Sequence, residues 1–244
     1  MNLENSKEIV SIIQARMSST RLPGKVLLPL GNSTVLDEVI KRARLFSKNV
    51  IVCTSTHESD DELEKYCGQK NVICIRGDLE NVFSRYQKVF DISELKNFKW
   101  FARVTADNPL ISVNLAKDLI NRINPSLDYI AFCKKIPNGS AIELINTNTF
   151  LNINSESLEA EEKEHVTPMF YEKFKKYNSL IVEPNDFYKV GELRLTLDYE
   201  EDYELLKELF KLNTSISLEE VIELFKKDSS IFKLNKNCRQ KKIR

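Results

Sequence analysis

The sequence predicts an α/β protein built on a doubly wound, mostly parallel sheet, and three observations support this. Up to about residue 133, short apolar runs alternate with amphipathic helical patterns, which is the element order of a sheet covered by crossover helices. Several runs are apolar at consecutive positions, as in strands buried on both faces. The chain has 244 residues, 42% of them hydrophobic, and such a length can bury one large core.

The predicted strands of this first part are 9–14, 49–54, 72–75, 100–105 and 129–133. Between the first two lies TVLDEVIKRARLF, residues 34–46, with an apolar stripe, acids at its start and bases at its end, as an amphipathic helix prefers. The segment ENVFSRYQKVF, residues 80–90, repeats the pattern. Both segments therefore predict helices that pack on the sheet.

The second half lacks regular crossovers and predicts a small antiparallel extension or lid over about 134–192. AIELINTNTF (141–150), NSLIVE (178–183) and LRLTLD (193–198) read as strands, and HVTPMFYEKF (165–174) reads as a short helix. Two further helices are expected, one from about Glu200 and one from the capping box Ser217-x-x-Glu220. We expect residues 1–232 to form a single domain and 233–244 a basic, solvated C-terminal tail.

Charge and cysteine content narrow the function classes. Lys plus Arg and Asp plus Glu both number 36, so the whole chain carries no footprint for nucleic acid or membrane. Five cysteines show neither a C-x-x-C pair nor metal-ligand spacing, which indicates reduced thiols. The start of the chain has no apolar signal region, and no stretch approaches the roughly 20 apolar residues of a membrane span. We expect a cytoplasmic protein with no nucleic-acid and no membrane partner.

The stretch IIQARMSSTRLPGKVL, residues 13–28, is the strongest functional signal. It follows the first predicted strand, at the carboxyl edge where doubly wound sheets bind ligands. Arg16, Arg21 and Lys25 lie around Gly24, whose missing side chain lets backbone amides approach a phosphate. The chain contains neither G-x-x-x-x-G-K-[ST] nor G-x-G-x-x-G. The loop suits a triphosphate bound with a metal ion, and a solvated loop with incidental charge is the alternative.

This stretch closely resembles the amino-terminal signature of the CMP-sugar synthetases, in particular 3-deoxy-manno-octulosonate cytidylyltransferases and the spore-coat-polysaccharide-type family. RGDLENVFSRY (76–86), FARVTADNPLIS (101–112), EHVTP (164–168) and LRLTLDYEEDYELL (193–206) extend the resemblance over most of 9–210. It implies a glycosyltransferase-A-like nucleotidyltransferase fold. It further implies Mg²⁺-dependent transfer of CMP from CTP to a small-molecule acceptor, a sugar acid or related polyol, with release of pyrophosphate, in surface-polysaccharide biosynthesis. A homodimer is compatible with it.

The resemblance also implies site residues. Asp107 and Asp198 match the family's metal-binding aspartates, and we place both at strand ends. The expected catalytic residues are Arg16, Lys25, Asp107 and Asp198. The expected nucleotide-binding residues are Ala15, Arg16, Met17, Ser18, Arg21, Gly24, Lys25, Arg76, Arg103 and Ala106.

Several of these assignments have alternatives. Arg103 lies on a buried strand, where its charge needs a phosphate or a carboxylate, so a structural ion pair with an acid competes with a nucleotide contact. The other acids, Asp60, Asp61 and Asp202, are interpreted as helix caps.

On the acceptor side the resemblance points to Gly139, Glu143 and His165, the last at the start of a short helix. PNGSAIE (137–143) carries Ala141 where the family has an aspartate, and residues 105–109 read TADNP where the family usually has TGDCP. Because alternate strand residues share a face, we expect Ala141 beside Glu143.

These departures leave the acceptor open. Lys134 and Lys135 keep a phosphate- or phosphonate-bearing acceptor as an alternative. A glycosyltransferase of related fold is another, against which the absence of a D-x-D motif argues. A nucleotide-binding module without activity would be favoured if Asp107 and Asp198 lay far apart.

Overall fold

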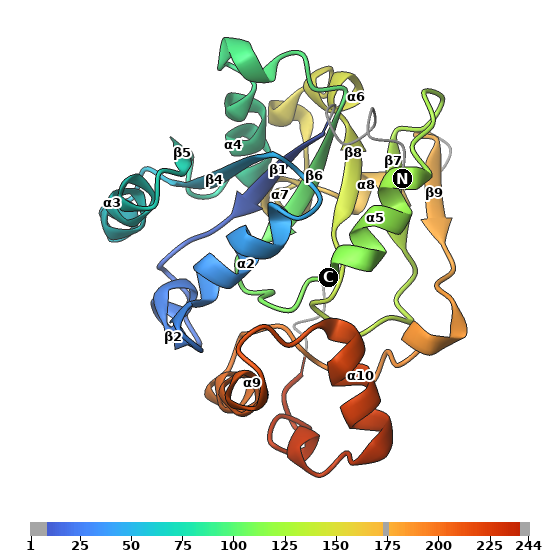
Figure 1. Cartoon of the computed structure of the whole chain (residues 1–244). Coiled ribbons are helices and arrows are strands. Elements are labelled where there is room, and N and C mark those ends of the chain that lie inside the picture. The colour runs from blue at the N-terminus through green and yellow to red at the C-terminus, as the bar shows by residue number, and fades with distance from the viewer. Residues whose placement is uncertain (1–8, 173–175, 240–244) are drawn as a thin grey trace.

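A seven-stranded sheet forms the centre of the protein. The computed structural model describes residues 9–172 and 176–239 (Figure 1). The strand order is β5-β4-β1-β6-β8-β7-β9. The strands are β1 (Ile9–Gln14), β4 (Asn49–Ser55), β5 (Ile73–Gly77), β6 (Trp100–Thr105), β7 (Tyr129–Phe132), β8 (Glu143–Asn146) and β9 (Ser179–Val182). Every neighbouring pair is parallel except those of β8, which runs antiparallel to β6 and β7. The doubly wound, mostly parallel sheet is therefore confirmed.

The antiparallel part of the second half lies within this same sheet. β8 inserts between β6 and β7 and pairs Arg103 with Glu143 in register, and β9 adds a parallel edge next to β7. A separate two-stranded antiparallel sheet joins β2 (Pro29–Leu30) to β3 (Ser33–Thr34). It follows the loop that contains Lys25.

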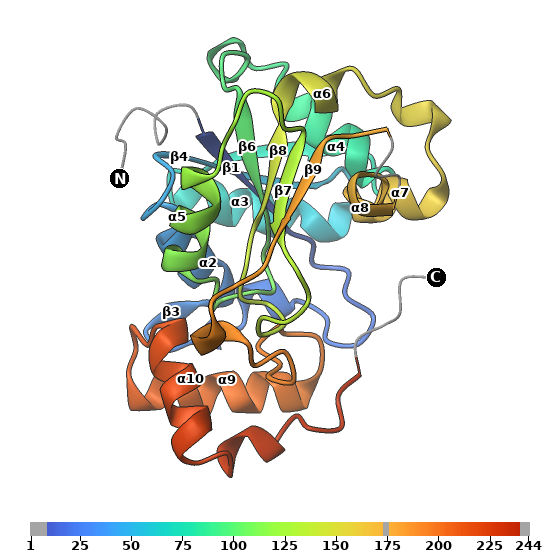
Figure 2. The same ribbon diagram turned by 90° about the vertical axis from the view of Figure 1, so that its right-hand side faces the viewer.

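Helices cover both faces of the sheet (Figures 1 and 2). They are α2 (Val35–Ala43), α3 (Asp61–Gln69), α4 (Val82–Val89), α5 (Val113–Asn121), α6 (Thr147–Leu151), α7 (Ala160–His165), α8 (Pro168–Glu172), α9 (Glu200–Leu212) and α10 (Leu218–Lys227). α2, α3 and α5 pack into a first core cluster that extends to α9 and α10 below the sheet. α4, α6 and α8 pack into a second cluster on the opposite face. The described helices include none that is long and apolar enough to span a bilayer.

Hydrogen-bonding side chains set the helix starts. Thr34 and Ser217 form capping boxes with Asp37 and Glu220 at α2 and α10. Ser112 accepts from the Leu115 amide at the start of α5. Each cap satisfies amides that have no partner inside the helix.

Three predicted elements of the second half differ from the structure. Residues 193–198 form no strand there, only a single bridge between Arg194 and Asn138, because their amides are shared between two loops: Leu195 donates to Asn138 and Leu197 to Asp107. The predicted strand 141–150 is a strand only over Glu143–Asn146 and then becomes α6.

His165 ends α7 and does not begin a helix. The next helix, α8, begins at Pro168, where proline is favoured because the first helical amide needs no partner.

Candidate active site

The ammonium group of Lys25 lies at the meeting point of two loops that the sequence keeps far apart. Its Nζ donates to Asp107 Oδ2 at 2.8 Å, to Asp198 Oδ1 at 2.9 Å and to the Leu197 carbonyl at 2.6 Å. Three donors thus meet three oxygen acceptors, which satisfies the ammonium group completely. We call this group of Lys25, Asp107, Asp198 and the Leu197 carbonyl the cage. The Lys25 side chain is 9% exposed and that of Asp107 25%, so the cage is buried on the lysine side and opens to solvent at Asp107.

Local structure explains how these groups meet. Lys25 begins the short 3-10 helix Lys25–Leu27 directly after Gly24, which has φ 69°, a left-handed conformation that glycine adopts without strain. Asp107 follows β6, where the Ala106 amide donates to the carbonyl of Gln14 on β1 at 2.9 Å. Asp198 stands in the extended segment just before α9, not at a strand end.

Asp198 is surrounded by cationic groups. Arg21 Nη2 lies 2.8 Å from Oδ1, which Lys25 also contacts, and Arg194 Nη2 lies 3.1 Å from Oδ2. Burial alone would raise the pKa of Asp198, but attraction to Lys25 and hydrogen bonds from Lys25 and Arg21 lower it to about 2. Burial likewise opposes the charge of Lys25, yet Asp107 and Asp198 raise its pKa above the ordinary value. Both groups are therefore charged at neutral pH.

The loop between β1 and Lys25 is closed by backbone hydrogen bonds. The Ala15 amide donates to the Cys53 carbonyl at 3.0 Å, and the Gly24 amide donates to the Met17 carbonyl at 3.0 Å. Arg16 and Ser18 are exposed on this loop. The loop thus has a backbone held by hydrogen bonds, while the cationic group of Arg16 and the hydroxyl group of Ser18 face solvent.

Asp60, interpreted from the sequence as a helix cap, anchors this loop instead. Its carboxylate is fully buried and accepts from the Met17 amide at 2.7 Å and the Ser55 amide at 3.0 Å. It makes no side-chain cap for α3. The cap interpretation of Asp60 is therefore wrong, because the tertiary partner Met17 takes the carboxylate.

Two predicted nucleotide contacts are engaged with protein groups. Arg76 donates to the carbonyls of Ser55 and His57 and forms ion pairs with Asp61 and Glu64. Arg103 pairs with Glu143 at 2.5 Å, the structural ion pair considered as its alternative.

The predicted acceptor residues occupy different places. Gly139 has φ 87°, and a Cβ there would lie 2.7 Å from the Thr196 amide nitrogen. Its turn therefore packs directly on the chain leading to Asp198. Glu143 also accepts from the Tyr129 hydroxyl, and Tyr129 belongs to the second core cluster.

Ala141, in contrast, packs against the first cluster, so the expectation that it stands beside Glu143 is not met. The reason is that β8 begins only at Glu143, and the alternation of faces does not extend back to residue 141.

Asp107 and Asp198 supply carboxylate oxygens, the ligand type that a hard divalent cation prefers. Asp107 and Asp198 contact the same ammonium group, so their carboxylates lie within two hydrogen-bond lengths of each other. A nucleotide-binding module without activity would have been favoured if the two aspartates lay far apart, and they do not. Within residues 9–172 and 176–239, no group of three or more His, Cys, Asp or Glu side chains could hold a metal. A metal held by two aspartates would complete its coordination with phosphate oxygens and water, as Mg²⁺ commonly does.

Arg194 and Asp202 also belong to the site, although the sequence did not indicate this. Arg194 binds both Asp198 and Asp202. Asp202 does take part in a capping box with Tyr199, but it also accepts from the Asp198 amide at 3.0 Å. The i, i+4 spacing of Arg194 and Asp198 was the only sequence signal for this arrangement.

The chain is similar to known cytidylyltransferases in sequence and in fold. The sequence profile described as Cytidylyltransferase matches residues 10–237. The spore coat polysaccharide biosynthesis protein SpsF of Bacillus subtilis is 34% identical over 232 residues, which cover 91% of this chain and 95% of SpsF. A cytidylyltransferase structure from Leptospira borgpetersenii has a TM-score of 0.83 at 28% identity and covers 97% of this chain and 100% of that one. A CMP:2-keto-3-deoxy-manno-octonic acid synthetase complexed with CTP shares the fold, with a TM-score of 0.64 at 18% identity over 84% of this chain and 99% of that one.

Proposed function

Because this chain belongs to the cytidylyltransferase family, we propose that it transfers CMP from CTP to a hydroxyl group of a sugar acid or related polyol. In this reaction the acceptor oxygen bonds to the α-phosphorus and gives its proton to solvent, the bond from that phosphorus to the bridging oxygen breaks, and pyrophosphate leaves. The observation that carries the proposal is the cage in which Asp107, Asp198 and Lys25 meet at the end of β6. It joins two carboxylates to a cation at the edge of the sheet where such folds bind nucleotides.

Each residue of the site has a role in this proposal. Arg16, Arg21 and Lys25 bind the triphosphate, and Asp107 and Asp198 hold Mg²⁺. When bound, Mg²⁺ would offset the charge that develops on the departing pyrophosphate. The protein itself contributes position and fixed charge, and needs no covalent intermediate.

Lys25 changes partners in this scheme. Before substrate binds, its ammonium group neutralises the two aspartates. With Mg²⁺ held by the two aspartates, the same ammonium group would be free to contact a phosphate.

Relatives support the acceptor class. SpsF is named for spore coat polysaccharide biosynthesis, and the CTP-bound fold relative is a synthetase of a sugar-acid nucleotide. We therefore propose a role in surface-polysaccharide synthesis, with Gly139, Glu143 and His165 on the acceptor side. A phosphate-bearing acceptor has less support, because Lys135 is engaged with Glu183 at 2.6 Å. All five cysteines are unpaired, which suits the reducing cytoplasm.

A screen for pyrophosphate release tests this function. Purified protein with CTP and Mg²⁺ is offered a panel of sugar acids, neutral polyols and sugar phosphates, with UTP and ATP as competing nucleotides. We expect release with CTP and a sugar acid or polyol, dependent on a divalent cation. Asp107→Asn should raise the barrier by about 2 to 4 kcal/mol. Release with UTP or ATP in preference to CTP, or undiminished turnover in Asp107→Asn, would overturn the proposal.

A further inference from the structure

Asp202 forms a hydrogen-bonding centre directly behind the metal-site aspartate. Its carboxylate is 1% exposed and accepts from Arg194 Nε and Nη2, each at 2.9 Å. It also accepts from the backbone amides of Asp198 at 3.0 Å and Tyr199 at 3.1 Å. Because Arg194 in turn contacts Asp198 Oδ2, Asp202 constrains both the backbone and the carboxylate of Asp198.

A further hydrogen bond to Asp202 comes from the segment that follows α10. Asn235 Nδ2 donates to Asp202 Oδ1 at 2.8 Å and to the Arg194 carbonyl at 3.1 Å. Asn235 is only 5% exposed, although it lies in the basic stretch that was expected to be a solvated tail. Its neighbours Lys236 and Asn237 are exposed. One asparagine of this stretch is thus buried against the site while the residues next to it face solvent.

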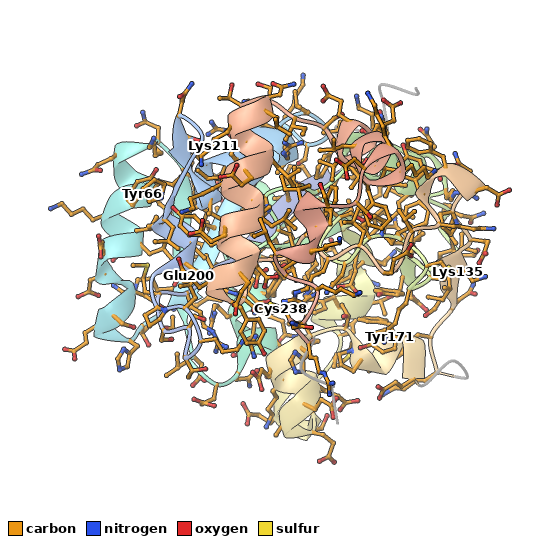
Figure 3. The ribbon with its side chains drawn as sticks, turned by 90° about the horizontal axis from the view of Figure 1, so that it is seen from below. Tyr66, Lys135, Tyr171, Glu200, Lys211 and Cys238 are labelled. Carbon is orange, nitrogen blue, oxygen red and sulfur yellow. The ribbon has the colours of Figure 1, made fainter. Side chains whose placement is uncertain are left out.

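Further contacts hold residues 231–239 in place. Phe232 is 7% exposed and packs against Phe225 of α10 with ring centroids 5.1 Å apart. The Tyr199 hydroxyl donates to the Arg239 carbonyl at 3.4 Å. Figure 3 shows Cys238 beside the start of α9, and its Sγ lies 3.9 Å from Glu201 Oε2. The segment therefore crosses the first turn of α9, next to Asp198.

We propose that residues 231–239 act as a C-terminal latch, in which Asn235 is a positioning residue that holds Asp202 and Arg194 so that Asp198 is set for metal binding. The inference rests on the proposed role of Asp198 as a metal ligand. Removing a donor from a buried carboxylate is costly, and Asp202 lowers this cost if it shifts towards its other donors, Arg194 and the Asp198 amide, which also define the position of Asp198. Substituting the hydrogen-bonding partners of a metal ligand typically weakens metal binding about 10- to 100-fold.

The test compares full-length Asn235→Ala with Asn237→Ala, which removes an exposed asparagine two residues away. Electron paramagnetic resonance measures Mn²⁺ binding to each protein saturated with CTP, and calorimetry measures CTP binding in EDTA. We expect Asn235→Ala to weaken Mn²⁺ binding about tenfold and Asn237→Ala to change it less than twofold. CTP affinity without metal should stay within twofold in both. Asn235→Leu, which is close in size but lacks the two N–H donors, should behave like Asn235→Ala.

The outcomes separate the latch from the function. Unchanged Mn²⁺ affinity in both Asn235 variants, even with a lowered melting temperature, would show that the segment only stabilises the fold and would overturn the latch. Failure of both variants to fold would overturn it as well, because the segment would then belong to the folding core. A wild-type protein that binds CTP but no Mn²⁺ would overturn the metal site itself, and the latch with it.

Discussion

The ammonium group of Lys25 lies between the carboxylates of Asp107 and Asp198, where a bound metal ion would also neutralise their charge. Its Nζ has three oxygen partners within 2.9 Å, two of them carboxylates, and an ammonium group with three acceptors resembles a coordinated cation in charge and surroundings. The signature around Gly24 indicated a phosphate-binding lysine. Its pairing with Asp107 and Asp198 depends on contacts 82 and 173 positions away in sequence, and no local pattern encodes such contacts.

Lys25→Ala should therefore change metal and nucleotide binding in opposite directions. Mn²⁺ alone should bind more tightly, because the two aspartates lose the cation that neutralises them. CTP should bind about tenfold more weakly or worse, since a charged hydrogen bond contributes about 1.5 to 3 kcal/mol, while CMP should lose less than threefold. Calorimetry on this variant measures all three affinities.

Lys41→Ala is the matched control, because the Lys41 side chain is 54% exposed on α2 and all three affinities should stay unchanged. Equal losses of affinity for CTP and for CMP in Lys25→Ala would show that Lys25 does not contact the β and γ phosphates.

The lowered pKa of Asp198 predicts a pH dependence of stability. The pKa is about 2 in the folded protein, below the ordinary value of 3.8 that the unfolded chain retains. Asp198 thus stabilises the fold fully above about pH 4, and this contribution is lost as the pH falls towards 2. Asp198→Asn should lower the free energy of unfolding by about 2 kcal/mol at pH 6, and the difference from wild type should shrink below pH 4.

Urea denaturation at a series of pH values measures this difference. Asp118→Asn is the control, since Asp118 pairs with Arg122 at the surface, where both side chains are 44% exposed, and such pairs contribute less than about 1 kcal/mol. A difference for Asp198→Asn that stays constant from pH 6 to pH 3 would contradict the account.

At the scale of elements, the strands of the centre were the most predictable part. The bounds predicted for β1 and β6 coincide with those observed, Ile9–Gln14 and Trp100–Thr105, because both strands are mostly apolar and mostly buried. The segment 193–198 has the same kind of pattern yet makes no ladder in the structure. The pattern correctly indicates that the segment is buried. A strand also needs a neighbouring strand to pair with, and whether one is present depends on the tertiary fold.

The turn at Gly139 yields a prediction at this scale. Gly139→Ala should destabilise the protein by about 2 kcal/mol, because φ is 87° and the new Cβ would lie 2.7 Å from the Thr196 amide nitrogen. Gly68→Ala is the matched substitution, since Gly68 lies in α3 with nothing within 4 Å of its Cβ position.

Gly68→Ala should stabilise the protein by about 0.5 to 1 kcal/mol. Chemical denaturation of both variants checks the pair, and equal effects of the same sign would show that the Gly139 turn does not require glycine.

At the scale of the whole molecule, the first core cluster runs from Ile9 in β1 to Phe232 near the end of the chain. We propose on this basis that the two halves form one domain. Composition and alternation predicted the sheet, and the family resemblance pointed to Asp107 and Asp198, which both contact Lys25. The supporting residues Asp60, Arg194 and Asn235 were not recognised, because each acts through partners that only the folded chain brings near: Asp60 contacts Met17, 43 positions away, and Asn235 contacts Asp202, 33 positions away.

A crystal structure of the protein with CTP and Mn²⁺ tests the central claim most directly, because the anomalous signal of manganese locates the metal independently of any assumption. The account predicts a peak held by Asp107, Asp198 and triphosphate oxygens, with Lys25 Nζ moved from between the two carboxylates to a phosphate. A manganese peak away from both aspartates, with Lys25 still bound to Asp107 and Asp198 and the triphosphate elsewhere, would contradict it.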